Sequence, residues 1–437
     1  MIRDLSILTA CTLAVSAAVV PATPACRQQA AAPAAATADA TPTRAASPAR
    51  ARLAAAETHL DSAPADPEAL AAFAAACVDV GRLTADAAWY QRAEAAIGKA
   101  LAADPGSYQA LRLRAWVLGG QHRFADSAAA ARQAMAREPR DPWNYGTLCD
   151  ALVETGDYDG AETACQTMLD LQPALPAFAR AAHLRELFGD TQGAMEMMTL
   201  ALRAADPRDP EQQAWCLTQR GHLHWNSGDA QAAQRDYDSA LAKAPASAEA
   251  LAGAARVAAL HGEGERAESL RAHAIALIPA AGVVAESEAA LTAAGRVSEA
   301  RDRLALLEGI AGLERQRTGI FDRQTALALA DRRLMTDEAL ASARREITER
   351  KDIYGWDALA WTALSAGDVG EARAAIVNAL SLGTRDARLR YHAGMIALAA
   401  GDSAAARAHL MAALDINPAF DRTGAERARA ALSTLHG

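Results

Sequence analysis

Between Ala214 and Pro245 the apolar positions follow the period of an α-helix twice, in two separate blocks. The first block carries apolar or small side chains at Trp215, Leu217, Gly221 and Leu223, and the second at Ala233, Tyr237, Ala240 and Leu241. Gly228-Asp229 separates the blocks and Pro245 follows the second, and both are signals that end helices. The pattern predicts two helices joined by a short turn, in contact where Gly221 and Ala233 carry little bulk.

This two-block unit recurs along the chain. Closing prolines are spaced by 34 residues at Pro105, Pro139, Pro173 and Pro207, and again at Pro245 and Pro279. Turn glycines stand at Gly156, Gly189, Gly228, Gly262, Gly295, Gly367 and Gly401, and an alanine follows each of them five residues later. A period of this length predicts a solenoid in which each unit packs only on its neighbours.

The composition of the unit resembles the tetratricopeptide-repeat (TPR) family. The shared features are a small residue in the first helix, a turn glycine, an alanine, an aromatic residue and a closing proline, here Gly221, Gly228, Ala233, Tyr237 and Pro245. Residues 141–173 and 388–418 match nearly as well, and the resemblance covers roughly 350 residues. It implies an all-α, right-handed α-solenoid of about ten stacked helix-turn-helix repeats, and it is silent about the partner.

The repeats are expected over residues 52–420, with a capping helix over 421–437. Two repeats are irregular. The first is expected to have a long turn between Gly81 and Trp89. The other lies between Gly295 and Gly367, where residues 325–332 and 337–350 have helical patterns without a turn glycine.

The N-terminal segment has the order of a secretory signal. An apolar run over residues 5–20 precedes a small-residue region over 21–25, so we expect residues 1–25 to direct export to the periplasm or the exterior. Two alternatives would tether the protein to a membrane: an uncleaved signal, or lipidation of Cys26, which follows the run directly. Residues 26–51 are rich in Ala, Pro and Thr and predict a flexible tether.

Composition and charge narrow the classes of function. Hydrophobic residues make up 51% of the chain and aromatic residues only 5%, so the helices are expected to pack closely over small side chains. The net charge is −9 and no Lys/Arg run occurs, which argues against a nucleic-acid partner. The sequence contains no G-x-S-x-G, P-loop, H-E-x-x-H or C-x-x-C motif, so we expect neither enzyme activity nor a cofactor.

The first helices are expected to line the concave face of the solenoid. Their exposed stripe falls thirteen, ten, nine, six and three residues before each turn glycine. Trp143, Trp215, Trp225 and Trp361 lie on this stripe, and Trp116 joins them if the turn of its repeat lies at His122. Exposed tryptophans are common interface anchors, although they could instead brace neighbouring helices. Trp89 and Trp356 fall off the stripe and are expected in the core.

Polar residues complete the predicted partner-binding stripe: Asp150, Arg180, His183, Gln219, His222, Arg256, Asp357, Tyr391 and His392. Three of them, Asp150, His183 and His222, stand six residues before their turns and form one column. Asp and His are metal ligands, but neighbouring first helices lie about 9–10 Å apart, so a polar wall is favoured over a metal site.

Two cysteines flank one predicted turn. Cys149 and Cys165 lie on either side of Gly156-Asp157, at equal distance from it, so a helical hairpin would bring them level. In an exported protein the pair is a candidate for a disulfide, but two buried thiols that replace small residues at the helix contact are the favoured interpretation.

Together these features predict a non-enzymatic scaffold that binds a protein or an extended peptide on its concave face. An envelope location would fit a role in assembly or regulation there. The alternatives are a receptor for a small ligand or metal ion, and a non-catalytic subunit of an enzyme complex.

Overall fold

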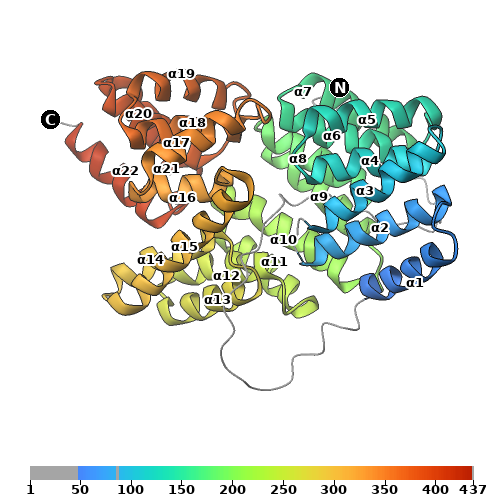
Figure 1. Cartoon of the computed structure of the whole chain (residues 1–437). Helices are drawn as coiled ribbons and strands as arrows, with labels where there is room; N and C mark the ends of the chain where they lie inside the picture. The colour runs from blue at the N-terminus through green and yellow to red at the C-terminus, as the bar shows by residue number, and fades with distance from the viewer. Residues whose placement is uncertain (1–47, 85–87, 436–437) are drawn as a thin grey trace. The chain divides into compact units, whose positions relative to one another are not determined.

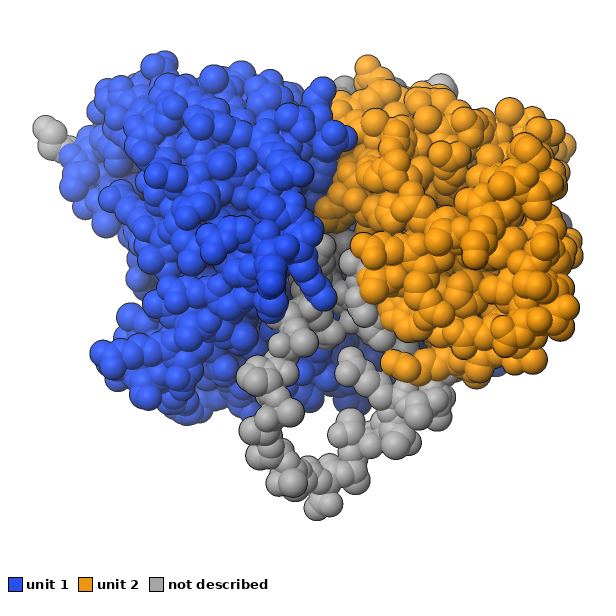
Figure 2. Space-filling model, in the orientation of Figure 1, with its two compact units in different colours: residues 1–22, 173–437 blue, residues 23–172 orange. Residues whose placement is uncertain are grey.

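The computed structural model describes residues 48–84 and 88–435, which form α-helices throughout (Figure 1). The predicted signal and most of the predicted tether lie outside these residues. The chain divides into two compact units (Figure 2), and the described residues 48–172 belong to unit 2 and 173–435 to unit 1. The sequence predicted one uninterrupted array instead.

Unit 2 contains the first seven helices. They are α1 (Pro48–Ser62), α2 (Pro67–Thr84), α3 (Ala88–Ala103), α4 (Tyr108–Gly120), α5 (Phe124–Arg137), α6 (Pro142–Thr155) and α7 (Tyr158–Leu171). Helix α1 begins inside the predicted tether. Helix α2 continues through Gly81, where a Cβ would lie 3.1 Å from the Cβ of Trp89, so most of the long turn expected there is helix.

Unit 1 contains the remaining helices. Its first half comprises α8 (Leu175–Leu187), α9 (Thr191–Ala204), α10 (Pro210–Asn226), α11 (Ala230–Lys243), α12 (Ala248–Leu260), α13 (Gly264–Leu277), α14 (Ala281–Ala293) and α15 (Val297–Thr318). Its second half comprises α16 (Arg323–Arg332), α17 (Thr336–Glu346), α18 (Ile353–Ala366), α19 (Val369–Ala379), α20 (Ala387–Ala399), α21 (Ser403–Ile416) and the predicted cap α22 (Arg422–Thr434). From α2 to α21 the helices pack in ten consecutive pairs, in agreement with the predicted repeats.

The Gly-Asp markers have a direct structural cause. All seven predicted turn glycines have positive φ, from 72° at Gly295 to 89° at Gly367, which only glycine adopts without strain. The aspartate that follows caps the second helix, as Asp229 does by accepting a hydrogen bond from the backbone N–H of Ala232 at 2.9 Å. In the repeat without a glycine, Arg333 and Met335 take the left-handed conformation.

Small residues set the distance between helices. Ala233 is fully buried, and a Cβ on Gly221 would lie 2.7 Å from the Tyr237 ring. First helices of neighbouring repeats also contact each other within each unit, as α4 does with α6 and α18 with α20, which places them on the inner side of the curve. None of the described helices is long and apolar enough to span a membrane.

Candidate binding surface

The turn between α4 and α5 lies at His122, the position that puts Trp116 on the predicted stripe. His122 has a φ of 61°, the left-handed conformation that glycine supplies elsewhere, so Trp116 stands six residues before a genuine turn. Tyr108, Arg112 and Trp116 are spaced by four residues on α4 and therefore share one helix face.

Arg112, Trp116 and Trp143 form a stacked set that we call the Arg112 platform. The rings of Trp116 and Trp143 stack with centroids 4.6 Å apart, and the Arg112 guanidinium lies over the Trp143 ring at 4.3 Å. Asp141, the N-cap residue of α6, supports the platform. Its carboxylate accepts hydrogen bonds from the Trp143 backbone N–H at 2.9 Å and from the Tyr108 hydroxyl. The pKa of Tyr108 is raised, mainly because the hydroxyl is buried and secondly because it donates to Asp141.

Two donors of the platform make no hydrogen bond within the described chain. They are Nε of Arg112, which lies 3.5 Å from the nearer Asp141 oxygen, and Nε1 of Trp143. Both atoms are buried although Arg112 and Trp143 are only half-buried as residues. A buried donor without an acceptor costs about 1–3 kcal/mol, so a ligand that shifts the covering side chains and brings an oxygen to these atoms would be favoured.

In unit 1 the stripe remains partly open between α10 and α14. Trp215 is half-buried and its Nε1 also makes no hydrogen bond within the described chain. Gln219 donates to Glu249 at 3.3 Å, and Arg256 pairs with Glu286 at 2.8 Å. The Glu286 carboxylate raises the pKa of Arg256, so this arginine is held charged on the inner face.

Four other predicted stripe residues instead pack against one another inside unit 1. His392 stacks on Trp361 with centroids 4.0 Å apart, and its Nδ1 lies 2.8 Å from the Asp357 carboxylate. Trp361 donates from Nε1 to Asp331 at 2.8 Å, and Tyr391 packs beside both rings. All four side chains are buried. We therefore correct the expectation that Trp361, Tyr391, His392 and Asp357 are exposed: they brace α18 against α20.

Trp116, Trp225 and Arg180 are also buried. Trp116 is covered by Trp143, and Arg180 donates to the backbone carbonyl of Pro176 within its own helix at 3.0 Å. The half-buried tryptophans on the stripe are thus Trp143 and Trp215. Trp356 packs against a core cluster as expected, whereas Trp89 is half-buried beneath Arg92.

The predicted column of Asp and His residues does not come together as a ligand set. His222 bonds to the Tyr237 hydroxyl at 2.8 Å, and His183 is exposed with its Nδ1 3.9 Å from Glu186. Among the described residues no three His, Cys, Asp or Glu side chains gather closely enough to hold a metal. Cys149 and Cys165 are free, buried thiols in this structure, so the disulfide alternative is not realised.

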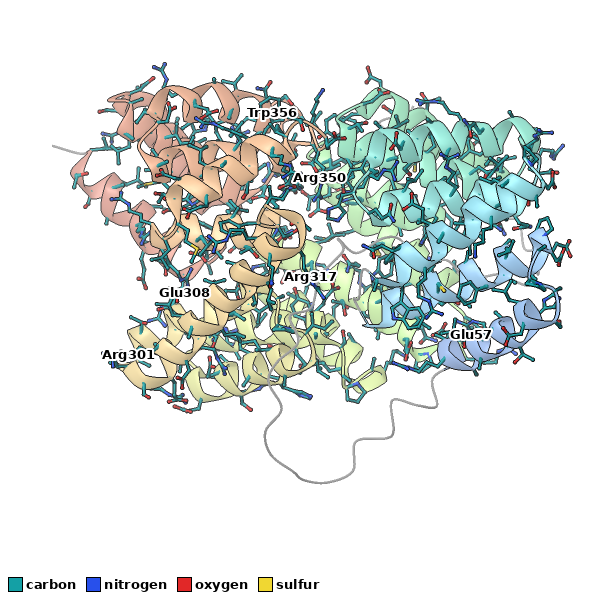
Figure 3. All side chains as sticks on the ribbon, in the orientation of Figure 1. Glu57, Arg301, Glu308, Arg317, Arg350 and Trp356 are labelled. Atoms are coloured by element: carbon teal, nitrogen blue, oxygen red, sulfur yellow. The ribbon has the colours of Figure 1, made fainter. Side chains whose placement is uncertain are left out.

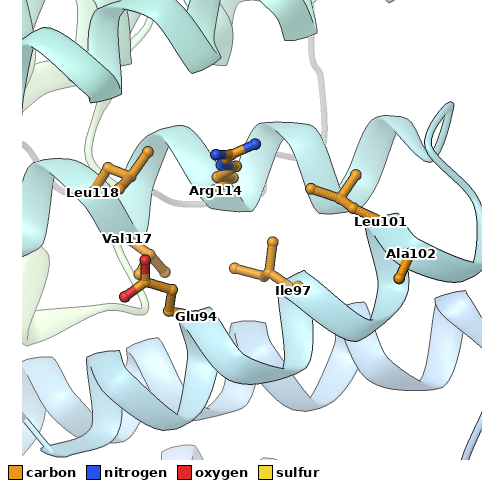
Figure 4. Close-up of a pocket in the computed structure, with 8 residues that line it drawn as sticks. Glu94, Ile97, Leu101, Ala102, Arg114, Val117 and Leu118 are labelled. Atoms are coloured by element: carbon orange, nitrogen blue, oxygen red, sulfur yellow. The ribbon is translucent and has the colours of Figure 1, made fainter.

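A hollow of about 380 Å³ lies between α3 and α4, away from the stripe (Figure 4). Ile97, Leu101, Val117 and Leu118 contribute apolar walls. The Glu94 carboxylate at its edge already accepts bonds from Gln121 at 2.8 Å and Arg123 at 2.9 Å. Because this carboxylate is already paired and the walls are mostly apolar, the hollow is a weaker candidate than the platform.

Sequence reasoning missed the residues that hold the side chains of the stripe in place. Tyr108 and Asp141 support the platform, and Glu286 fixes Arg256. Only Asp141 had a visible signal, because an aspartate before Pro142 is a typical helix N-cap.

Comparison with known proteins finds similarity at the level of the repeat. The model of the family described as "Tetratricopeptide repeat" matches residues 120–186 and again residues 387–420. No curated protein matches the chain.

Solved structures of similar fold share little sequence. A thermophilic TPR protein of Thermus thermophilus is 19% identical over 44% of this chain and 98% of that one, with a TM-score of 0.38. Pseudomonas aeruginosa pilF is 19% identical over 49% of this chain and 92% of that one, with a TM-score of 0.38. Human IFIT1, as a dimer with PPP-AAAA, is 17% identical over 76% of this chain and 77% of that one, with a TM-score of 0.43.

The family assignment rests on the repeats of the chain itself and on the two matches to the family model. Ten helix pairs recur, seven of their turns carry a glycine with left-handed backbone, and a capping aspartate follows five of these glycines. The two matched segments lie far apart in the sequence, the first mostly in unit 2 and the second in unit 1. The chain is therefore a tetratricopeptide-repeat protein with an all-α solenoid fold.

Proposed function

We propose that this protein is a non-enzymatic scaffold that binds an extended polypeptide along the inner face of its repeats, with the Arg112 platform as its main anchor in unit 2. TPR architecture in general supports a protein-binding scaffold. The observation that carries the proposal is the pair of donors without acceptors, Arg112 Nε and Trp143 Nε1, beside a stacked aromatic surface.

An extended peptide supplies what the platform lacks. Its backbone carbonyls are regularly spaced acceptors, and its side chains can cover the half-buried ring of Trp143. Arginine and tryptophan are also the residue types that dominate the binding energy of interfaces. In unit 1, taken by itself, Trp215 and the Arg256–Glu286 pair offer an apolar surface and both signs of charge on the corresponding helix faces.

Selection and titration test this proposal. Short random peptides displayed on phage would be selected on the full chain, and the dissociation constants of synthetic copies measured by calorimetry. Arg112→Ala should weaken binding by about 2 kcal/mol, or roughly thirtyfold. Trp143→Phe keeps an aromatic ring and removes the N–H, so it should cost about 1 kcal/mol, or fivefold.

The matched control is Arg132→Ala, an exposed arginine on the second helix α5 of the same unit. This variant should bind like the wild type. Peptides that bind all variants equally would contradict the proposal. Binding of a single-stranded RNA oligonucleotide, lost in Arg112→Ala while no peptide is selected, would replace it with a nucleic-acid function.

Export is a separate part of the proposal and is supported by the apolar run over residues 5–20 and the small residues that follow it. The mature protein should begin near Thr23, or at a lipidated Cys26 that tethers it to a membrane. N-terminal sequencing of fractionated cells decides this, and an intact Met1 in the cytoplasmic fraction would contradict it.

A further inference from the structure

Two loops near the C-terminus of unit 1 contact helices that lie almost 200 residues earlier in the chain. The hydroxyl of Thr384, in the loop before α20, donates to the backbone carbonyl of Leu187 at the end of α8. The side-chain amide of Asn417, in the loop before α22, donates to the carbonyl of Trp225 in α10 at 2.7 Å. Solenoid repeats ordinarily contact only their neighbours, so these bonds add a closure that the repeat alone does not require.

The two contacts are in register and bring backbones close together. The turn after α8 meets the loop before α20, where a Cβ on Gly189 would lie 2.9 Å from the Gly383 carbonyl oxygen. The next turn along, after α10, meets the loop before α22, where a Cβ on Gly228 would lie 3.0 Å from the Ile416 oxygen. We call this surface the seam: residues 187–189 and 225–228 on one side, and 383–385 and 416–420 on the other.

The seam caps helix ends. Leu187 and Trp225 stand in the last two residues of α8 and α10, where backbone carbonyls lack partners inside the helix. Thr384 and Asn417 are both buried. Thr384 supplies a partner for the Leu187 carbonyl, and Asn417 adds a second bond to the Trp225 carbonyl, which already accepts from the Gly228 N–H at 3.0 Å. If the seam opens, water can form hydrogen bonds with the same carbonyls and side chains. Opening therefore leaves none of these polar groups buried without a partner.

The contacts across the seam are sparse. Apart from isolated contacts, none of the helices α8 to α11 packs on any of α18 to α22 in the described chain. In the cluster of Trp225 and Tyr237, the residue contributed from the far side of the seam is a small one, Ala419. Like charges also repel across the seam. The pKa of Asp386 is raised by burial, then by the nearby charge of Asp357, and to a smaller extent by Glu186 on the other side.

We propose that the seam is a latch: unit 1 alternates between the closed state, in which the ends of α8 and α10 meet the loops before α20 and α22, and an open solenoid in which Trp225 and the inner face between α8 and α20 become accessible. The closed state is held by Thr384, Asn417 and Ala419. Opening needs only a small rotation at each repeat interface, because the rotations of successive repeats add up along the solenoid. The latch belongs to unit 1 alone and does not depend on peptide binding by the Arg112 platform.

The test combines Thr384→Val with Asn417→Asp. Valine keeps the branched shape and removes the hydroxyl. Aspartate keeps the oxygen that accepts from the Ala419 N–H at 2.8 Å, so the local turn survives, but it presents an acceptor to the Trp225 carbonyl. Thr362→Val is the matched control, because Thr362 is equally buried and its hydroxyl bonds within its own helix to Ala358 at 2.7 Å.

Distances would be measured by double electron–electron resonance in the full, ligand-free chain. Spin labels at the exposed residues Gln192 and Ser381 flank the seam, and labels at Gln192 and Gln231 lie on one side of it as a reference. Cys11 and Cys26 would be replaced by serine, and the four buried cysteines would be kept. This variant, before any cysteine is introduced for labelling, should take up no spin label.

The wild type and Thr362→Val should show a main short distance across the seam, and the double variant should shift its main population to longer distances. The reference pair should not change. An unchanged distribution in the double variant, or no short population in the wild type, would overturn the latch. Loss of helical circular dichroism in the double variant and in both single variants would show that the seam is an obligatory part of the core, and would overturn it equally.

Discussion

At the scale of single residues, the repeats are held together by contacts that leave no room for one methyl group. Tyr237 is fully buried, and its ring fits between Gly221 of its own repeat and Gly253 of the next one. The ring position is further fixed by the bond from its hydroxyl to His222. Packing at this density makes added volume more harmful than the helix propensity gained by removing a glycine.

Gly253→Ala and Gly312→Ala should therefore have opposite effects. A Cβ on Gly253 would collide with the Tyr237 ring, so this variant should lose about 1–3 kcal/mol of stability. Gly312 lies inside the helix α15 with no atom within 4 Å of its Cβ position, so alanine should gain up to about 1 kcal/mol. Urea unfolding measures both. Similar changes in the two variants would show that close packing around Tyr237 is not what limits this interface.

Glu314 predicts a pH dependence of stability. It is buried at the end of α15, and desolvation raises its pKa from 4.5 to about 7, against hydrogen bonds from Asp322 and Thr325 that favour the charged form. Because the folded pKa is above the unfolded one, the folded state binds more protons between these values. Stability from this group is therefore fully present below about pH 4.5 and is lost as the pH rises towards 7, by about 3 kcal/mol at most.

Glu314→Gln should flatten the melting temperature between pH 4.5 and 7, since glutamine stays neutral. The control is Glu308→Gln on the exposed side of the same helix, labelled in Figure 3, which should leave the profile of the wild type. A Glu314→Gln profile as steep as that of the wild type would show that other groups cause the dependence.

At the scale of elements, the turn between paired helices is the feature that the sequence predicted best. Glycine followed by aspartate has one clear role, a left-handed residue and then a helix cap, so five turns could be located from these two letters. The turns at Gly262 and Gly295 were located from the glycine and the repeat period. The turns at His122 and Arg333 use the same backbone without a glycine. The Arg333 turn showed only as an interruption of the helical pattern, because nothing in the letters marks an arginine as left-handed.

Arg333→Gly should stabilise the irregular repeat. The left-handed conformation, with φ of 53° and ψ of 41°, costs a non-glycine residue about 1–2 kcal/mol, and part of that gain is lost to the greater freedom of glycine in the unfolded chain. We expect a net gain of roughly 0.5–1 kcal/mol in thermal unfolding. Gly367→Ala, at a turn with open space around its Cβ, should lose about 1 kcal/mol for the same reason. A loss of stability in Arg333→Gly would contradict the assignment of strain to this turn.

At the scale of the whole molecule, the sequence did not predict which other helices cover the stripe. Spacing alone placed Trp361 and His392 on the stripe, yet a position on a helix face does not fix the distance to the next helix, and the two rings stack. The seam was beyond prediction for a further reason. Contacts between Trp225 and Asn417 depend on curvature summed over several repeats, and no local pattern encodes that sum.

The central claim is that the inner face of the first helices binds the partner, and photocross-linking in living cells tests it most directly. A benzophenone amino acid would replace Asp150 or His183 on the inner stripe, and Arg132 or Arg235 on exposed faces of second helices. We predict a cross-linked polypeptide of one size from both inner positions, abolished by Arg112→Ala for the Asp150 probe, and none from the outer positions. Cross-links of equal yield from the outer positions, or none from the inner ones, would contradict the account.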